Sequence, residues 1–218
     1  MKATMKNHPA FSMAAPRRLA LLAAMIAVAG LNSACAPLVV GAVVGGGAMV
    51  ATDRRTSGSQ LEDQTIELKA GARIREQLGS SAHVSVNSYN RVALATGEVS
   101  SEADRQAIER IVAGVENVQR VMNETAVMEA SSLKSRSNDV WISSQIKAKL
   151  VDARDLFSNA YDVVVTRGTV YLMGRVTERE AVRATDIARQ ISGVNKVVRA
   201  FEIISEDELA RLQPKQKE

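Results

Sequence analysis

Residues 168–176 read Gly-Thr-Val-Tyr-Leu-Met-Gly-Arg-Val, and this stretch decides the fold because its pattern occurs twice. Residues 90–99 read Asn-Arg-Val-Ala-Leu-Ala-Thr-Gly-Glu-Val. Each copy begins with a turn former, continues with apolar residues at alternate positions, and reaches a glycine followed by one more apolar residue. Such alternation is typical of a half-buried strand that ends in a bulge or tight turn. Two copies indicate a duplicated module.

The residues around each copy extend the repeat. After the glycine, Ser or Thr with a nearby acidic residue is typical of a helix N-cap, and apolar residues at helical spacing follow. Gly114 and Gly193 then predict the ends of these helices. An additional strand is expected after each helix (residues 118–127 and 197–204). A strand (84–86 and 163–165) and an amphipathic helix (66–78 and 142–150) are expected before each copy.

The predicted fold class is therefore α+β. Each module has the order helix–strand–strand–helix–strand, with a small mixed sheet covered on one face by two helices. The modules span residues 63–128 and 139–204, with a linker at 129–138 and a charged tail at 205–218. Pairing Leu94 with Leu172 leaves one extra residue before Gly97. The expected core residues are Val84, Val86, Val92, Leu94, Ile108, Ile111 and Val118 in the first module, and Ile142, Ile146, Leu150, Val163, Val165, Val170, Leu172, Ile187, Ile191 and Val197 in the second.

Residues 1–34 are predicted to be a secretory signal peptide. Four basic residues precede twelve uncharged, almost wholly apolar residues at 19–30. This apolar run is too short to span a bilayer. Arg17-Arg18 also occurs in twin-arginine signals, although paired arginines are common in ordinary ones.

Cys35 is the only cysteine, so it has no disulfide partner within the chain. Residues 33–35, Ser-Ala-Cys, resemble a bacterial lipobox, although Asn32 departs from it. Acylation of Cys35, for example with palmitate, would give a stable anchor. By resemblance to such lipoproteins, Ala36 in place of Asp after the cysteine implies sorting to the outer membrane. The alternative is a soluble periplasmic protein cleaved near Ala34. Residues 35–62 form a Gly/Ala-rich tether whose apolar part, 38–51, either lies at the membrane or packs on a copy of itself, or serves only as a linker.

The charge of +4 originates in the signal. Its charged residues are Lys2, Lys6, Arg17 and Arg18, so 24 basic and 24 acidic residues remain in the mature chain. This balance disfavours nucleic acid as a partner. Residues 63–128 contain 7 basic and 9 acidic residues, whereas residues 139–204 contain 10 and 8. The second module is thus the better candidate for binding an anionic surface.

The repeat resembles the BON family, and in particular the dual BON-domain lipoproteins of the bacterial outer membrane. Residues 170–176 and 191–197 carry the resemblance most clearly, and residues 138–150 resemble the first helix of a second BON domain. The resemblance implies a non-enzymatic role in envelope maintenance, binding to phospholipid and no cofactor other than the lipid on Cys35.

The residue inventory also disfavours catalysis. His83 is the only imidazole of the mature chain, and a surface position is expected for it. Nucleophilic catalysis needs an oriented base and zinc needs several N or S ligands, and the sequence offers neither.

Trp141, the only tryptophan, lies about 100° from the core stripe of Ile142, Ile146 and Leu150 on a helical wheel. An indole in the first helical turn after Asn138-Asp139 suits a membrane interface, where helix amides and lysines could meet lipid phosphates. The alternative is packing against the neighbouring module, and the residues alone leave both open. The family resemblance favours lipid. The predicted phospholipid-binding residues are Asn138, Asp139, Trp141, Ser144, Gln145, Lys147 and Lys149.

The sequence thus predicts a lipid-anchored protein of the outer membrane that faces the periplasm and binds anionic phospholipid through its second module. A rival interpretation is an adaptor that docks on an envelope protein complex or a cell-wall enzyme.

Overall fold

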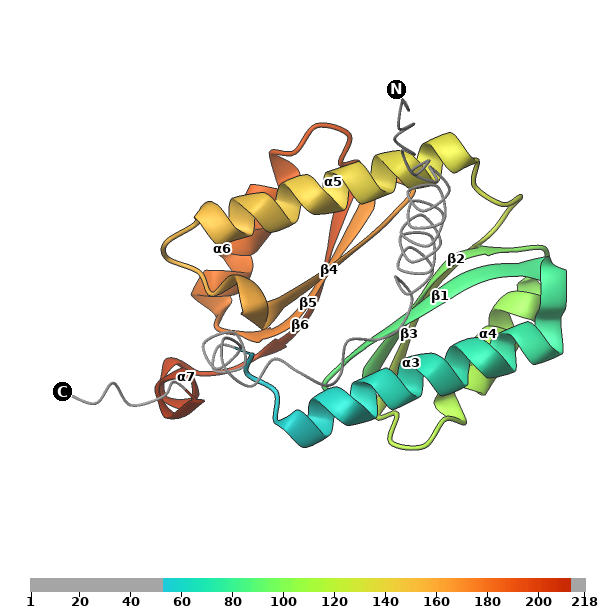
Figure 1. Ribbon diagram of the computed structural model, residues 1–218, viewed down its shortest axis with the longest axis horizontal. Coiled ribbons are helices and arrows are strands. Elements are labelled where there is room, and N and C mark those ends of the chain that lie inside the picture. The colour runs from blue at the N-terminus through green and yellow to red at the C-terminus, as the bar shows by residue number, and fades with distance from the viewer. Residues whose placement is uncertain (1–52, 213–218) are drawn as a thin grey trace, which may run out of the picture. The chain divides into compact units, whose positions relative to one another are not determined.

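The computed structural model describes residues 53–212, and its elements follow the predicted order twice (Figure 1). The first module contains α3 (Ser57–Leu78), β1 (Ala82–Tyr89), β2 (Val92–Val99), α4 (Glu102–Ala113) and β3 (Arg120–Val127). The second contains α5 (Leu133–Asp152), β4 (Tyr161–Thr166), β5 (Thr169–Val176), α6 (Glu178–Arg189) and β6 (Lys196–Ile203), with α7 (Glu206–Leu212) after it. The predicted signal, Cys35 and the apolar segment 38–51 lie outside the described residues.

Each module has a mixed three-stranded sheet with its second strand in the centre, which confirms the predicted fold class. β1 is antiparallel to β2, which is parallel to β3, and β4, β5 and β6 repeat this arrangement. Two-residue turns join the antiparallel strands: Asn90-Arg91 has φ values of 49° and 66°, and Arg167-Gly168 has 52° and 69°. Positive φ at both positions is the type I′ geometry that fits the twist of a hairpin.

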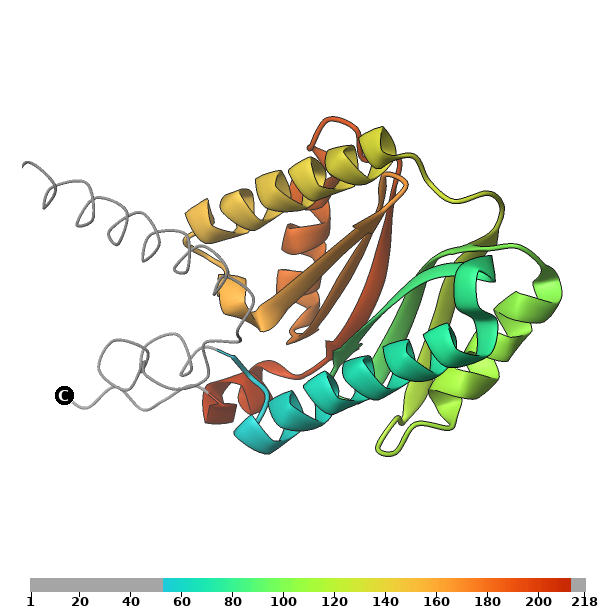
Figure 2. The same cartoon turned by 45° about the vertical axis from the view of Figure 1, so that its right-hand side comes forward.

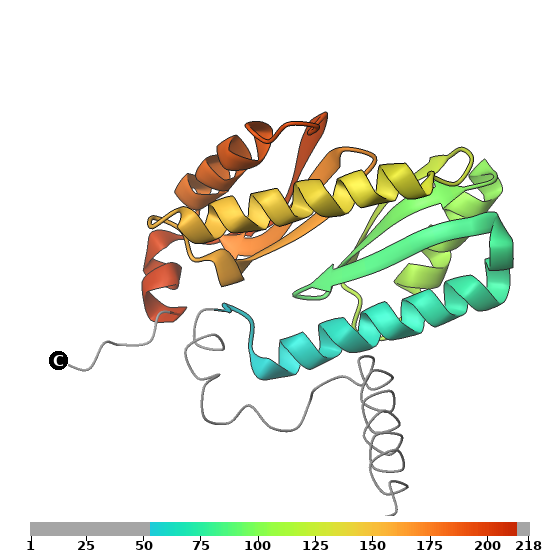
Figure 3. The same ribbon diagram turned by 45° about the horizontal axis from the view of Figure 1, so that its top comes forward.

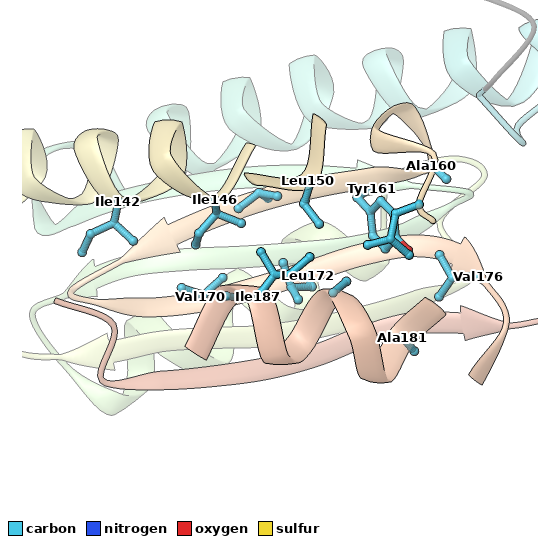
Figure 4. Packing of buried hydrophobic residues seen from close by; sticks show 14 residues of the cluster. Ile142, Ile146, Leu150, Ala160, Tyr161, Val170, Leu172, Val176, Ala181 and Ile187 are labelled. Carbon is cyan, nitrogen blue, oxygen red and sulfur yellow. The ribbon is translucent and has the colours of Figure 1, made fainter. Parts of the chain in front are cut away.

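Two helices cover one face of each sheet (Figures 2 and 3). Ile66, Ala70 and Ile74 from α3 pack with Ile108 and Ile111 from α4 in the first core. In the second, Ile142, Ile146 and Leu150 point from α5 toward Val170, Leu172 and Ile187 (Figure 4). All ten residues predicted for the second core lie in this cluster or pack against it.

The opposite faces of the two central strands form a third cluster that draws on both modules. It contains Tyr89, Leu94, Tyr171, Met173 and Ala200, with Val92 packed against it. The prediction that Val92 and Leu94 belong to the first core was therefore wrong, and Ala93 and Ala95 occupy those positions instead. A central strand that is buried on both faces is apolar on both, so alternation alone does not identify its inner face.

The one extra residue that was expected between Leu94 and Gly97 has the same cause, because it came from pairing Leu94 with Leu172. Gly97 pairs with Val84 and Gly174 pairs with Tyr161, and both glycines have positive φ, 126° and 154°. A Cβ on Gly97 would lie 2.1 Å from the carbonyl oxygen of His83, and one on Gly174 would lie 2.3 Å from that of Ala160. The two strands therefore match residue for residue, and glycine is required because the neighbouring backbone leaves no room for a side chain.

Polar contacts also join the modules, which belong to one compact unit. Arg54, just before α3, donates two hydrogen bonds of 2.7 Å to the carboxylate of Glu180 on α6. The two side chains are 5% and 1% exposed. Arg167 of the second module donates to the Glu98 carboxylate at 2.9 Å and to the Gly97 carbonyl oxygen at 2.9 Å. Burial of apolar surface between two small domains adds to the limited core of each one.

Several predicted boundaries differ from the structure. α3 begins at Ser57 and α5 at Leu133, so part of the expected tether and of the expected linker 129–138 is helical. α7 occupies part of the expected charged tail. α4 ends before Gly114 as predicted, whereas α6 ends at Arg189, four residues before Gly193. Over residues 53–212, no helix is long and apolar enough to cross a bilayer.

Candidate functional site

Trp141 lies on α5 and is exposed over 49% of its surface. It belongs to none of the three apolar clusters formed by the described residues. Asn138, Gln145 and Lys149 are three, four and eight positions away, so they lie along the same side of the helix, and all three are exposed. An indole of this exposure can contact a further surface without any rearrangement of the core.

The exposed lysines lie on two sides of α5. Lys149 shares the side of Trp141, whereas Lys147 lies seven positions from Val140, and both of these border a groove between the two modules. Within residues 53–212 neither ammonium group has an ion-pair partner. Ser144, also exposed, donates its hydroxyl to the carbonyl oxygen of Val140 at 2.9 Å. Most of the predicted set is therefore open to solvent, but it wraps around the helix instead of forming one row.

Asp139 is the exception, because its side chain points into the module and the residue is 7% exposed. Its carboxylate accepts the backbone N–H groups of Arg167 and Gly168, both at 2.8 Å. Asp63 has the same role in the first module, where it accepts those of Asn90 and Arg91, both at 2.8 Å. Each aspartate thus fixes a type I′ turn onto the first helix of its module.

This repeated aspartate was missed in the sequence. The available signal was its spacing, because Asp63 and Asp139 each lie three positions before the first core isoleucine, Ile66 or Ile142. A carboxylate on the core stripe of a helix needs a partner in the interior. The exposed surface of α5 therefore does not include Asp139.

The helix start was also misplaced, and this changes the position of Trp141. The N-cap is Ser132, whose hydroxyl accepts the N–H of Ser135 at 3.2 Å. Trp141 thus lies more than two turns inside α5, where the amides are bonded to preceding carbonyls. Helix-start amides next to Trp141, one part of the sequence-based interpretation, are therefore absent from its surroundings.

Three exposed apolar residues extend the outer surface of α5 beyond the predicted set. Leu133, Val140 and Val151 are 80%, 67% and 68% exposed. They lie seven and eleven positions apart, roughly opposite the core stripe of Ile142 and Ile146. The sequence contains that spacing, but Leu133 was not recognised as part of it because the helix was predicted to begin after residue 133.

The equivalent surface of the first module has a different character. Thr65 occupies the position of Trp141, 76 residues earlier, and donates its hydroxyl to the Leu61 carbonyl oxygen at 2.8 Å. Lys69, at the position of Gln145, is paired with Glu116. Arg73, at the position of Lys149, donates to the Gly114 carbonyl oxygen at 2.7 Å. The first module therefore has no exposed indole and fewer free cations at this surface.

The described residues do not bring catalytic groups together. His83 is exposed in β1, as expected for a surface histidine. In the range 53–212 no group of three or more potential ligand side chains could hold a metal ion. What α5 presents to solvent is a surface made of an indole, exposed aliphatic groups and ammonium groups.

The comparisons with known proteins agree with this architecture. The BON domain model matches residues 62–129 and 138–205. The chain is similar to a protein named outer membrane lipoprotein DolP from Haemophilus influenzae, with 37% identity over 171 residues that cover 76% of this chain and 88% of that protein. It is also similar to a 21 kDa hemolysin from Actinobacillus pleuropneumoniae, with 28% identity over 154 residues that cover 70% and 79% of the two chains.

Two further similarities are weaker. Osmotically-inducible protein Y of Escherichia coli is 31% identical over 144 residues that cover 64% of this chain and 72% of that protein. Among solved structures, the C-terminal domain of CdsD from the Type III secretion system of Chlamydia trachomatis aligns with a TM-score of 0.28 and 11% identity, over 61% and 96% of the two chains. A TM-score this low carries no argument.

Proposed function

The chain belongs to the BON-domain family, and on that premise we propose that it is an outer-membrane lipoprotein whose second module binds anionic phospholipid. In this proposal acyl chains on Cys35 hold the protein on the periplasmic side of the outer membrane. α5 then lies against the headgroups and helps to maintain the integrity of the envelope. No catalytic step is part of this role. The relative named outer membrane lipoprotein DolP supports the proposed location.

The observation that carries the proposal is the exposure of Trp141. The residue is 49% exposed to solvent although tryptophan is large and apolar. Full burial of a large apolar side chain is worth about 1.5–3 kcal/mol, so covering the exposed half would contribute about 1 kcal/mol. A membrane interface suits an indole because the ring enters the headgroup region while its N–H stays hydrated.

Charge supports the same partner. Lys147 and Lys149 are exposed and free of ion pairs within the described residues. A lysine close to an anionic bilayer contributes about 1 kcal/mol. Together the two would contribute about 2 kcal/mol, a factor of roughly thirty in affinity. The first module lacks this combination, since Thr65 replaces the indole and Lys69 is paired with Glu116.

The test is binding to vesicles of phosphatidylglycerol and phosphatidylethanolamine by flotation, with residues 1–34 omitted and Cys35→Ser present so that no acyl chain contributes. The double variant Lys147→Glu, Lys149→Glu should bind at least thirtyfold more weakly. Trp141→Ala should bind about fivefold more weakly. Neither change touches a core side chain, so circular dichroism should be unchanged.

Exposed residues outside α5 provide matched controls for the charge changes and for the loss of the indole. Arg120 and Lys196 begin β3 and β6 and are both exposed. Changing both to Glu alters the net charge by the same amount, but it should leave binding nearly unchanged. Leu68→Ala removes an apolar side chain that is 74% exposed on α3. Equal losses in the controls and the α5 variants would refute α5 as the binding surface.

A further inference from the structure

A groove of about 750 Å³ lies between the two modules. Residues 82–85 and 87 of β1 line one wall, and residues 162–166 of β4 line another. Side chains of α5, including Ser143 and Lys147, border the groove as well. Its volume lies within the range of about 300–1,000 Å³ that is usual for ligand sites.

Both strands in the groove are edge strands. The sheet orders are β1-β2-β3 and β4-β5-β6, so β1 and β4 each pair on one side only (Figure 3). Consecutive residues of each strand border the groove, although side chains of a strand alternate between two faces. The groove is therefore bounded by strand edges, where backbone N–H and C=O groups remain open to a partner.

The register identifies the outward backbone groups. Tyr89 and Val92 flank the two-residue turn as a hydrogen-bonded pair, and such pairs alternate along an antiparallel ladder. The backbone groups of Ser88, Val86 and Val84 therefore point away from β2. Ser88 confirms this direction, because its N–H donates to Oε1 of Glu67 at 2.8 Å.

The same reasoning applied to β4 shows a partly occupied edge. Val163 points outward, and its N–H donates to Oδ1 of Asp162 at 2.9 Å. Its carbonyl oxygen accepts the hydroxyl of Ser143 at 3.3 Å. Side chains already satisfy the centre of β4, whereas Val84 and Val86 leave the edge of β1 open.

The charges of the groove favour an acidic occupant. Arg75 and Lys147 line it without an ion-pair partner in the described range. Two of its carboxylates are already engaged, Glu98 with Arg167 and Asp139 with the turn amides. Asp162 is the remaining carboxylate, so the unpaired charge of these groups is positive.

We propose that this groove binds an extended, acidic peptide segment of a protein partner, which adds as a fourth strand to the outer edge of β1. Main-chain hydrogen bonds to Val84, which lines the groove, and to Val86, the next outward position on the same strand edge, would provide affinity, as in other cases of strand addition. Arg75 would select for acidic side chains. The groove shares Lys147 with the proposed lipid-binding surface. The inference does not depend on lipid binding, because Val84, Val86 and Arg75 are not among the proposed lipid-binding residues.

The experiment is NMR of the ¹⁵N-labelled chain that lacks residues 1–34 and carries Cys35→Ser. The probe is an acetylated and amidated peptide of alternating Val and Glu, added to about 1 mM, so that binding with a Kd of about 1 mM is still detected. We expect shifted amide signals and slower hydrogen exchange at Val84 and Val86. The same peptide with N-methyl groups at alternate residues should not bind, because it lacks the strand donors.

Two variants sharpen the test. Val86→Pro removes one outward N–H at an edge position, where proline is tolerated, and should abolish binding. Arg75→Glu leaves the strand intact and should weaken binding about threefold, the effect of one exposed ion pair. If Val86→Pro does not fold, the N-methylated peptide and the Arg75→Glu variant still test whether the peptide binds to the edge of β1.

Three results would overturn the inference. The first is the absence of any response at Val84 and Val86. The second is equal binding of the N-methylated peptide. The third is a dependence of these two amide signals on protein concentration without peptide, which would assign the edge to a second copy of the chain.

Discussion

Replacing Arg54 with Met tests whether the segment before α3 fixes the two modules to each other. Both guanidinium Nη atoms bond the Glu180 carboxylate at 2.7 Å, and Nη1 also donates to the Arg175 carbonyl oxygen at 2.8 Å. With side chains 5% and 1% exposed, water cannot replace the lost partner without local opening. The Glu180 carboxylate would keep only the N–H of Thr177, at 3.0 Å.

The loss of stability in the Arg54→Met variant depends on whether Glu180 stays charged or becomes protonated. Removing one partner of a buried ion pair typically costs about 3–5 kcal/mol. Protonation limits that cost, because neutralising a carboxyl with an ordinary pKa of 4.5 at pH 7 takes about 2.5 units, or about 3.4 kcal/mol. We therefore expect the free energy of unfolding to fall by about 3 kcal/mol at pH 7. The deficit should shrink by about 1.4 kcal/mol per pH unit toward pH 5.

Urea unfolding followed by circular dichroism at pH 7 and pH 5 measures both quantities. The double variant Arg54→Met, Glu180→Gln should recover much of the loss, because no buried charge remains. Arg199→Met is the matched control, since Arg199 pairs with Glu178 on the same helix at 2.7 Å but in an exposed position. It should cost no more than about 1 kcal/mol. A loss for Arg54→Met that equals this control at both pH values would refute the buried contact.

Three further changes test other parts of the fold. Asp139→Ala leaves two turn amides without an acceptor, and it should cost about 2 kcal/mol and speed hydrogen exchange at Arg167 and Gly168; unchanged exchange would argue against this role. Gly174→Ala places a Cβ 2.3 Å from a carbonyl oxygen, so it should destabilise by more than about 3 kcal/mol, whereas Gly79→Ala, with φ of 54° and open space, should cost about 1–2 kcal/mol in thermal unfolding; similar costs would contradict the steric argument. Burial raises the pKa of Glu98, but hydrogen bonds from Ser131 and Arg167 outweigh it and hold the pKa below its usual 4.5. The contribution of the charged Glu98 to stability is therefore complete above pH 4.5 and is lost as the pH falls below that value. In the Glu98→Gln variant the free energy of unfolding should therefore fall less steeply as the pH is lowered below 4.5. An equally steep fall in the variant would refute this role of Glu98.

The sequence predicted the order of helices and strands because periodicity and capping are local. Thr177 and Glu180 form a capping box at the start of α6, and Ser101 caps α4. The first turns of α3 and α5 were missed because their residues have no apolar periodicity. Thr56 and Ser132 cap these turns from polar segments that read as linkers.

The inner face of β2 was assigned wrongly for a different reason. Its residues are apolar on both faces, and only the contact with the second module distinguishes Leu94 from Ala93. The Arg54–Glu180 pair joins residues 126 positions apart, so no local pattern predicts it. The exposure of Trp141 follows from the helical wheel, since the core stripe was correct. Lipidation of Cys35 and phospholipid binding stay predictions.

The fluorescence of Trp141 shows most directly whether α5 docks on anionic phospholipid, because the chain has no other tryptophan. Vesicles containing phosphatidylglycerol are added to the protein that carries Cys35→Ser, with brominated acyl chains as the quencher. We expect docking of α5 on the bilayer to give a blue-shifted emission and strong quenching with anionic vesicles, and neither effect with purely zwitterionic ones. Protein that floats with anionic vesicles while its emission stays unshifted and unquenched would contradict it.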